Sequence, residues 1–100
     1  MIYITQLIFI KEGKEEKFLE FERHAIPLME KYNGKIIYRL RPSSDDFIDA
    51  NIELPYEIHF ILFDSEQNLA KFMKDDSRLG FIHLKDESVK SMLLVKGEQI

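Results

Sequence analysis

Strand-like segments with apolar side chains at both odd and even positions constrain the fold of this chain more than any other feature. Residues 2–10 read Ile-Tyr-Ile-Thr-Gln-Leu-Ile-Phe-Ile, and β-branched and aromatic residues of this kind favour a strand. Successive side chains of a strand point to opposite faces of its sheet. Residues 2–10 are therefore apolar on both faces, which predicts a central strand that is covered on both sides.

A helix is predicted to follow this strand over residues 14–32. Its apolar residues recur every three or four positions, at Phe18, Phe21, Ala25, Leu28, Met29 and Tyr32, and charged residues fall mainly between them. Pro27 interrupts the pattern and removes one backbone hydrogen bond, so we expect a kink or a break near Ala25 and Ile26. Asn33 and Gly34 then end the helix, because both tolerate a left-handed conformation.

The second half of the chain repeats the order of strands and helices. Residues 35–41 and 55–63 are predicted to form strands, joined by the unusually long connection 42–54. In the first of these strands Ile36, Tyr38 and Leu40 are expected on one face, with Ile37, Arg39 and Arg41 on the other. A helix capped by Asp64 or Ser65 runs to about Lys74. A further helical stretch follows over 78–90, with Leu79 and Ile82 among its apolar positions, and a last strand covers 91–96.

The order strand–helix–strand–strand–helix–strand is that of the split βαβ motif. It predicts an α+β, ferredoxin-like βαββαβ fold with a four-stranded antiparallel sheet and its helices on one face, because crossover connections are right-handed. The opposite face would then expose a large apolar patch. The simplest way to cover that patch is a second copy of the chain, so we expect a homodimer.

Composition narrows the class of protein further. A chain of 100 residues predicts one domain, spanning residues 1–100. With 18 acidic and 14 basic residues, the net charge of −4 argues against a nucleic-acid partner. The absence of cysteine excludes disulfides and thiolate chemistry. The apolar start is too short to span a membrane and lacks the basic leader of a signal peptide, so a cytoplasmic protein with no membrane partner is expected.

Charged residues on the two middle strands are the main candidates for a functional site. Arg39 and Arg41 share one face of the first strand, and Glu57 and His59 share one face of the second. These strands are neighbours in a hairpin, so the four side chains cluster if the register brings both faces to the same side. In a cavity, the arginines would hold a carboxylate or phenolic ligand and His59 would act as a general base. The alternative is an exterior face with cross-strand ion pairs.

Other polar residues carry weaker signals. Tyr38 and Tyr56, like Tyr3, could place hydroxyl groups in a cavity, although strand tyrosines usually serve packing. His24 lies four residues after Glu20, so a surface or semi-buried pair is expected there. His83 lies four residues before Glu87, and a structural or capping role is expected for it. The three histidines do not show the spacing of a metal site, so neither a metal nor a cofactor is expected.

Several runs of the chain resemble a known superfamily. The opening strand, the turn Lys11-Glu12-Gly13-Lys14 and residues 15–21 resemble the start of dimeric α/β-barrel proteins, including antibiotic-biosynthesis monooxygenase-like domains and a related small family of unknown function. Residues 63–66, 69–72 and 75–78 resemble the second half of the latter. The resemblance implies a ferredoxin-like protomer that dimerises sheet to sheet as a dimeric α/β barrel.

What the resemblance implies about activity is broad. Members of the superfamily include cofactor-free monooxygenases that oxidise phenolic substrates, isomerases, haem-binding enzymes and proteins of unknown role. Haem-degrading members use a Trp in their site, and this chain has none, so it departs from that branch. Because site residues differ between branches, no catalytic residue is carried over, and fold alone does not assign chemistry.

Two hypotheses follow from the sequence. In the first, the chain is a small-molecule-binding homodimer, such as a cofactor-independent monooxygenase or isomerase, with its cavity between the helices and the sheet or within the dimer barrel. His59 is its catalytic residue, and its substrate-binding residues are Arg39, Arg41, Glu57, Tyr38 and Tyr56. In the second, the chain is a non-enzymatic homo-oligomeric or protein-interaction domain, with the connection 42–54 as a further contact surface.

Overall fold

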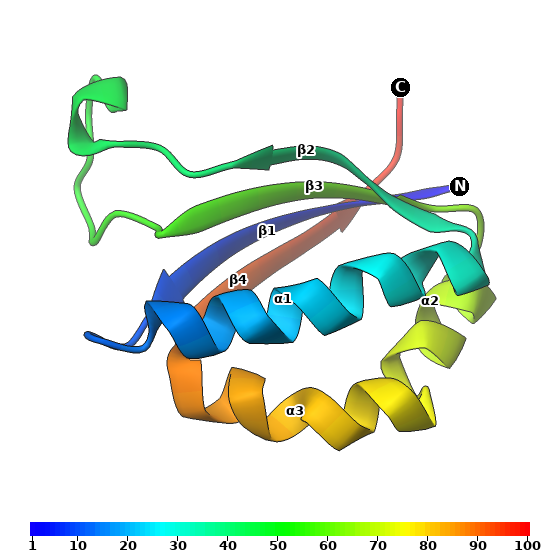
Figure 1. Ribbon diagram of the computed structural model, residues 1–100. Helices are drawn as coiled ribbons and strands as arrows, with labels where there is room; N and C mark the ends of the chain where they lie inside the picture. The colour runs from blue at the N-terminus through cyan, green and yellow to red at the C-terminus, as the bar shows by residue number, and fades with distance from the viewer.

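The computed structural model describes residues 1–100 and has two layers, a sheet and a set of helices on one of its faces (Figure 1). The elements are β1 (Ile2–Ile10), α1 (Glu15–Met29), β2 (Gly34–Leu40), β3 (Glu57–Phe63), α2 (Glu66–Met73), α3 (Asp76–Ser88) and β4 (Val89–Gly97), with single 3-10 turns at Glu30–Tyr32 and Ser44–Asp46. The four strands are antiparallel in the order β2-β3-β1-β4. The predicted ferredoxin-like α+β fold is confirmed.

The helices begin and end where local chemistry favours it. The Ser65 side chain accepts a hydrogen bond from the Asn68 backbone to start α2, and Asp75 accepts one from Arg78 to start α3. Asn33, with φ of 58°, is the left-handed residue that turns the chain into β2. None of these helices combines the length and apolar character that crossing a bilayer requires.

The break expected in α1 is absent. The helix continues through Pro27 to Met29. Pro27 lies in the last turn on the exposed side, and the carbonyl that loses its partner belongs to the exposed Arg23. Water can bond that carbonyl, which explains why a proline here does not end the helix.

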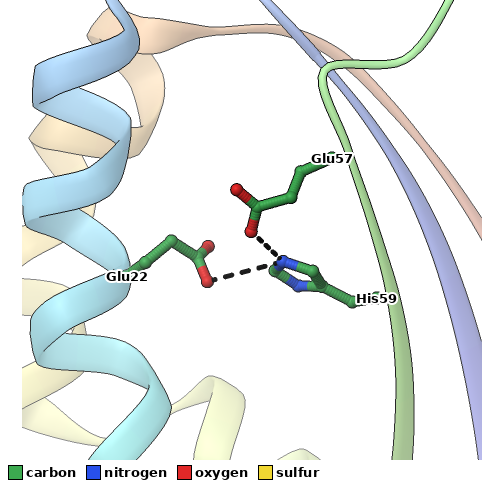
Figure 2. Close-up of side chains that lie close together, drawn as sticks. All are labelled: Glu22, Glu57 and His59. Carbon is green, nitrogen blue, oxygen red and sulfur yellow. Dashed lines mark hydrogen bonds and ion pairs between the residues drawn. The ribbon is translucent and has the colours of Figure 1, made fainter. Parts of the chain in front are cut away.

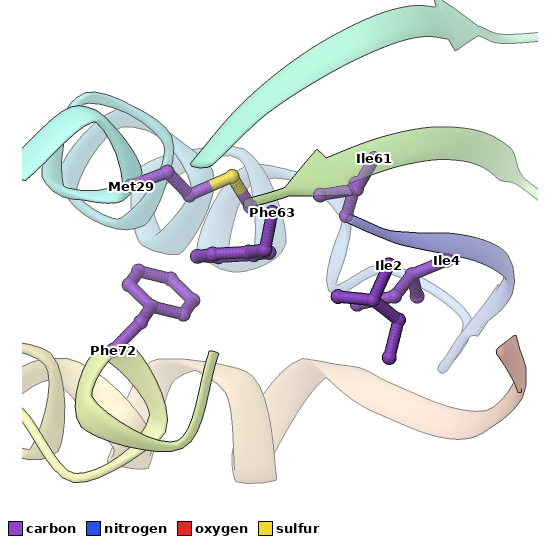
Figure 3. Close-up of a cluster of buried hydrophobic side chains, with 6 residues drawn as sticks. All are labelled: Ile2, Ile4, Met29, Ile61, Phe63 and Phe72. Atoms are coloured by element: carbon purple, nitrogen blue, oxygen red, sulfur yellow. The ribbon is translucent and has the colours of Figure 1, made fainter. Parts of the chain in front are cut away.

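The main core lies between the helices and the sheet at the end where β1 begins and β3 finishes (Figure 3). Ile2, Ile4, Ile61 and Phe63 point from the sheet toward Met29 of α1 and Phe72 of α2. Their alternate positions along β1 and β3 identify the helix-covered face of the sheet, which also carries Glu57 and His59.

A β-bulge in β2 changes which of its side chains face the helices. Ile36 pairs with Ile61, whereas Tyr38 pairs with Phe60, so Ile37 is an extra residue between them. Paired residues share a face. Ile36 therefore faces the helices and Tyr38 the opposite side, and the prediction that they share a face is wrong. Past the bulge, Arg39 pairs with His59 on the helix-covered face.

The opposite face of the sheet is apolar and uncovered by the helices. It exposes Tyr38, Leu40, Phe60, Leu93 and Val95, with the Tyr38 side chain 65% exposed and packed edge-on against Phe60. These residues come from β2, β3 and β4 and form one surface, called the open face below. Its exposure agrees with the sequence prediction that the helices shield only one side of the sheet.

Candidate functional site

A partly enclosed cavity of about 90 Å³ lies between the helices and the covered face of the sheet. Its walls come from all three helices and from β1, β3 and β4, and most of them are apolar. Five polar side chains also line it: Gln6, Glu22, His59, Arg78 and Lys85. An apolar cavity with a few converging polar groups is the usual form of a small-molecule site.

The four charged residues predicted on the middle strands come together on the covered face. Arg39 Nε donates to Glu57 Oε1 at 2.5 Å, and Arg41 Nη2 donates to Glu57 Oε2 at 2.8 Å. His59 Nε2 lies 2.6 Å from Glu57 Oε1. Glu57 and His59 are almost fully buried, and Glu57 is the centre of the cluster.

The surroundings of Glu57 keep it negatively charged. Burial raises the pKa of its carboxyl group, but hydrogen bonds from His59, Arg39 and Arg41 outweigh burial and hold the pKa at about 2. An ionised carboxylate can only accept hydrogen bonds, so Nε2 of His59 must carry the proton that it shares with Glu57. In the neutral imidazole, Nδ1 is then left as a proton acceptor.

A second carboxyl group approaches the same histidine from the helix layer. Glu22 of α1 extends toward His59 opposite Glu57, with its Oε2 3.8 Å from Nε2 (Figure 2). The pKa of Glu22 is raised to about 7: burial is the largest cause and the charge of Glu57 adds to it, while His59 opposes the shift. Glu22 can therefore take up or release a proton near neutral pH.

Arg39 and Arg41 do not line the cavity. Their side chains are 38% and 48% exposed and lie on the solvent side of Glu57. The guanidinium of Arg41 lies over the ring of Tyr56, 4.8 Å from its centroid. Both arginines therefore lie behind Glu57, away from the cavity wall.

The predicted tyrosines are also outside the cavity wall. Tyr56 precedes β3, and its ring packs edge-on against Phe18 of α1. Tyr38 lies on the open face, on the other side of the sheet. Tyr3 donates its hydroxyl hydrogen to Gln99. A substrate-binding role in this cavity therefore finds no support in the positions of these residues.

The remaining histidines make local contacts away from the cavity. His24 is exposed and stacks on Phe81 of α3, with ring centroids 4.2 Å apart. His83 is also exposed, and Glu87, four residues further along the helix, pairs with Lys17 at 2.8 Å. His24 does not form the ion pair with Glu20 that its spacing predicts.

Glu22, Glu57 and His59 offer three ligand atoms within 4.8 Å of one another, a spacing that could suit a metal ion. Both oxygens of Glu57 already accept hydrogen bonds from arginines, however, and His59 Nε2 is bonded to the same carboxylate. Two guanidinium groups this close would repel a cation. The arrangement is better suited to holding and moving a proton.

Sequence reasoning missed the polar cavity residues Gln6, Glu22, Arg78 and Lys85. For Glu22 a signal exists, because it lies four residues after Phe18 and three before Ala25, within the apolar stripe of α1. In α3 the expected apolar Leu79 is exposed, while its neighbour Arg78 is buried. This helix has too weak an apolar pattern for its inward side to be read from sequence.

No family model matches this sequence, and neither does any curated protein. Solved structures match its shape. A protein of unknown function from Rhodopseudomonas palustris gives a TM-score of 0.84 at 13% identity, over 99% of this chain and 82% of that one. An uncharacterized NIPSNAP domain protein from Burkholderia xenovorans gives 0.73 at 13% identity, over 100% and 95%.

A candidate antibiotic biosynthesis monooxygenase from Nitrosomonas europaea also matches, with a TM-score of 0.73 at 13% identity, over 100% of this chain and 99% of that one. At such identities the similarity shows the fold alone. The resemblance noted from the sequence, to antibiotic-biosynthesis monooxygenase-like domains and to small domains of unknown function, is confirmed at that level.

Proposed function

We propose that the protein binds a small, largely apolar molecule in the cavity and that His59 removes a proton from it, as in a cofactor-independent monooxygenase or isomerase. The observation that carries this proposal is that His59, which lines the cavity, is bonded to the buried Glu57, with Nε2 and Oε1 2.6 Å apart. A histidine oriented by an ionised carboxylate is a recurrent form of general base.

Each residue of the cluster has a role in this proposal. His59 accepts the substrate proton on Nδ1, and Glu57 stabilises the imidazolium that forms. Arg39 and Arg41 keep Glu57 charged and fix its two oxygens. Glu22, whose pKa of about 7 lets it carry a proton at neutral pH, lines the cavity and can return a proton to the product.

Two reaction types start from such a proton transfer. If the proton returns to a different carbon, the substrate is isomerised. If the carbanion of a CH₂ group reacts instead with dioxygen as co-reactant, the carbon gains one oxygen as a carbonyl, and the other oxygen leaves as water with the two hydrogens. The similarity in fold to the Nitrosomonas europaea protein supports oxygenation as one of the two proposed reactions. The small cavity favours a substrate with few atoms beyond one ring.

The proposal includes a homodimer formed through the open face, as the exposed Tyr38, Phe60 and Leu93 suggest. A single domain, a cytoplasmic location and the absence of nucleic-acid and membrane partners stay predictions of the sequence. The second candidate function is a non-enzymatic homo-oligomeric domain, and the same open face favours it. The two candidate functions differ in whether His59 catalyses a proton transfer.

Proton exchange tests the proposal directly. Cyclopentanone and 2-indanone are small apolar ketones with exchangeable C–H protons, and their uptake of deuterium from D₂O can be followed by NMR. His59→Gln is a suitable variant, because its amide can still donate to Glu57 but offers no base at Nδ1. His24→Gln is the control, since His24 lies outside the cavity.

The expected result is exchange of at least one ketone above the buffer rate, lost in His59→Gln and retained in His24→Gln. Oxygen consumption in the same samples separates oxygenation from isomerisation. Exchange at the buffer rate with both ketones, or unchanged exchange in His59→Gln, would refute the acid–base proposal and favour the non-enzymatic domain.

A further inference from the structure

Arg78 is a buried cation that forms no ion pair with a carboxylate. It lies in the first turns of α3, forms part of the cavity wall and is only 6% exposed. Its Nη1 donates to the backbone oxygen of Met73 at 3.3 Å, whereas its buried Nε–H finds no partner in the protein. A buried donor without a partner is costly, so one in a cavity wall points to a missing ligand atom.

The neighbours of Arg78 hold the guanidinium without satisfying its charge. Its central carbon lies 5.3 Å from the ring centroid of Phe72 and 5.9 Å from that of Phe21. These aromatic faces attract a cation and restrict its motion. They leave the in-plane N–H groups, which bind carboxylates most strongly, available for another partner.

Lys85 adds a second positive charge to the same wall. It lies seven residues after Arg78, which is two helical turns along the same face of α3. Neither cation has an acidic group within ion-pair distance. Burial lowers the pKa of both groups, and the charge of Arg78 lowers the pKa of Lys85 further. The charge of Glu22 opposes both shifts, and that of Asp86 opposes the shift of Lys85.

The acidic residues nearest the cavity form no ion pair with these two cations. Glu57 is already paired with Arg39 and Arg41 on its solvent side. Glu22 has a pKa of about 7, so it is only partly ionised at neutral pH. The side of the cavity formed by α3 is therefore positive, and most of the residues that face it are apolar.

We propose that Arg78, assisted by Lys85, binds the carboxylate of the ligand, so that the molecule in this cavity is a small carboxylic acid with an apolar body. The unpartnered Nε–H would donate to one carboxylate oxygen, and the ammonium group of Lys85 would add to the attraction. The inference deepens the proposed function and rests on it for the use of the cavity by a ligand. His59 faces the ligand from the sheet, and Arg78 faces it from the helix layer.

Matched pairs of acids and amides test this assignment. Butyrate and butyramide have nearly the same shape and differ in charge, as do benzoate and benzamide. The Nε–H resonance of Arg78, assigned by its loss in Arg78→Gln, reports binding by ¹H–¹⁵N NMR in the unchanged protein. Arg78→Lys retains a charge without the planar fork, and the control Arg23→Gln removes an exposed arginine outside the cavity.

The expected result is a saturable shift of the Arg78 Nε–H resonance with at least one acid, which binds more tightly than its amide. Arg78→Gln should weaken the binding of that acid by about tenfold or more and leave the affinity for the amide unchanged. The acid affinity of Arg78→Lys should lie between those of the wild type and Arg78→Gln, and that of Arg23→Gln should match the wild type. An amide that binds as tightly as its acid, no binding of either acid, or equal acid affinity in Arg78→Gln would overturn the assignment.

The carboxylate site and the proposed acid–base function can be tested separately, because binding of these acids involves no reaction. Retained acid binding together with ketone exchange at the buffer rate would refute the acid–base proposal alone. Ketone exchange that depends on His59, with no preference for acids, would refute the carboxylate site alone.

Discussion

His59 Nε2 and Glu57 Oε1 lie 2.6 Å apart, although both side chains come from the same strand and are separated by only one residue. Residues two apart on a strand share a face, so β3 alone places both side chains on the helix-covered face, where His59 lines the cavity. The helices contribute Glu22 from the opposite side (Figure 2). The shared face of the central pair therefore depends on one strand, whereas the approach of the second carboxylate, Glu22, depends on the packing of α1.

Glu57→Gln should destabilise the protein by about 1–3 kcal/mol at neutral pH, because it removes the charge that satisfies Arg39 and Arg41. The native pKa of Glu57 is about 2, below the ordinary 4.5, so its contribution is present above pH 4.5 and is lost as the pH falls toward 2. The stability of Glu57→Gln should not show this decrease at low pH. Urea denaturation at a series of pH values measures both effects.

Glu53→Gln is the matched control for that experiment. Glu53 also accepts hydrogen bonds from a cation, Lys90, at 2.9 and 3.0 Å, but both side chains are more than half exposed. Exposed pairs contribute little, so the control should change stability by less than about 0.5 kcal/mol. Equal effects of the two substitutions would contradict a special role for Glu57.

Glu22 should make stability depend on pH in the opposite sense. Its native pKa of about 7 lies above the ordinary 4.5, so its protonated form is favoured in the folded state. Stability should therefore be full below pH 4.5 and fall as the pH rises through 7, by roughly 3 kcal/mol if Glu22 acts alone.

Glu22→Gln keeps the shape of the side chain and cannot ionise. We expect the decline in stability between pH 4.5 and about 7 to be reduced in this variant, and the variant to exceed the wild type at higher pH. Chemical denaturation followed by circular dichroism measures the difference. Parallel curves for the two proteins over this range would show that Glu22 titrates normally.

Gly34→Ala should destabilise the fold by about 1–3 kcal/mol, because a Cβ at this position would collide with the ring of Phe63 in the packed core. Gly80→Ala is the control. A Cβ at Gly80 meets no atom, and Gly80 lies within α3, so alanine should stabilise the protein by up to about 1 kcal/mol. Thermal unfolding of both variants checks the two opposite signs.

Phe60→Lys should prevent association if the open face is a dimer interface, since it places a charge among Tyr38 and the other apolar residues of that face. Ile48→Lys is the control, because Ile48 is even more exposed but lies in the connection between β2 and β3. Light scattering coupled to size exclusion should give a dimer for the wild type and Ile48→Lys, and a monomer for Phe60→Lys. A monomeric wild type would rule out the interface.

Much of the fold was predictable because alternating and helical patterns report burial directly. The strand order and the helices follow from the apolar positions of β1, β3 and α1. The faces of the β2 side chains could not be predicted, since a bulge depends on pairing with β3 and has no sequence signature around Ile37. The break expected at Pro27 was also wrong, because the hydrogen bond that this proline removes lies on the solvent-exposed side of α1.

The candidate site was predictable only where it depends on a single strand. The shared face of Glu57 and His59 follows from their spacing, and both arginines meet them through the register of β2 and β3. Arg78 could not be found in this way, because its burial depends on how α3 packs against α1. Tertiary packing of a weakly amphipathic helix is not encoded in its periodicity.

The bulge at Ile37 gives β2 one residue more than its pairing with β3 uses. Deleting that residue would make Ile36 and Tyr38 neighbours opposite Ile61 and Phe60, so the strand would become regular and every later side chain would keep its present side of the sheet. During evolution, the loss of this codon would therefore preserve both surfaces of the sheet. A one-residue gap at this point is expected when distant relatives are aligned, and it would not signal a change of site.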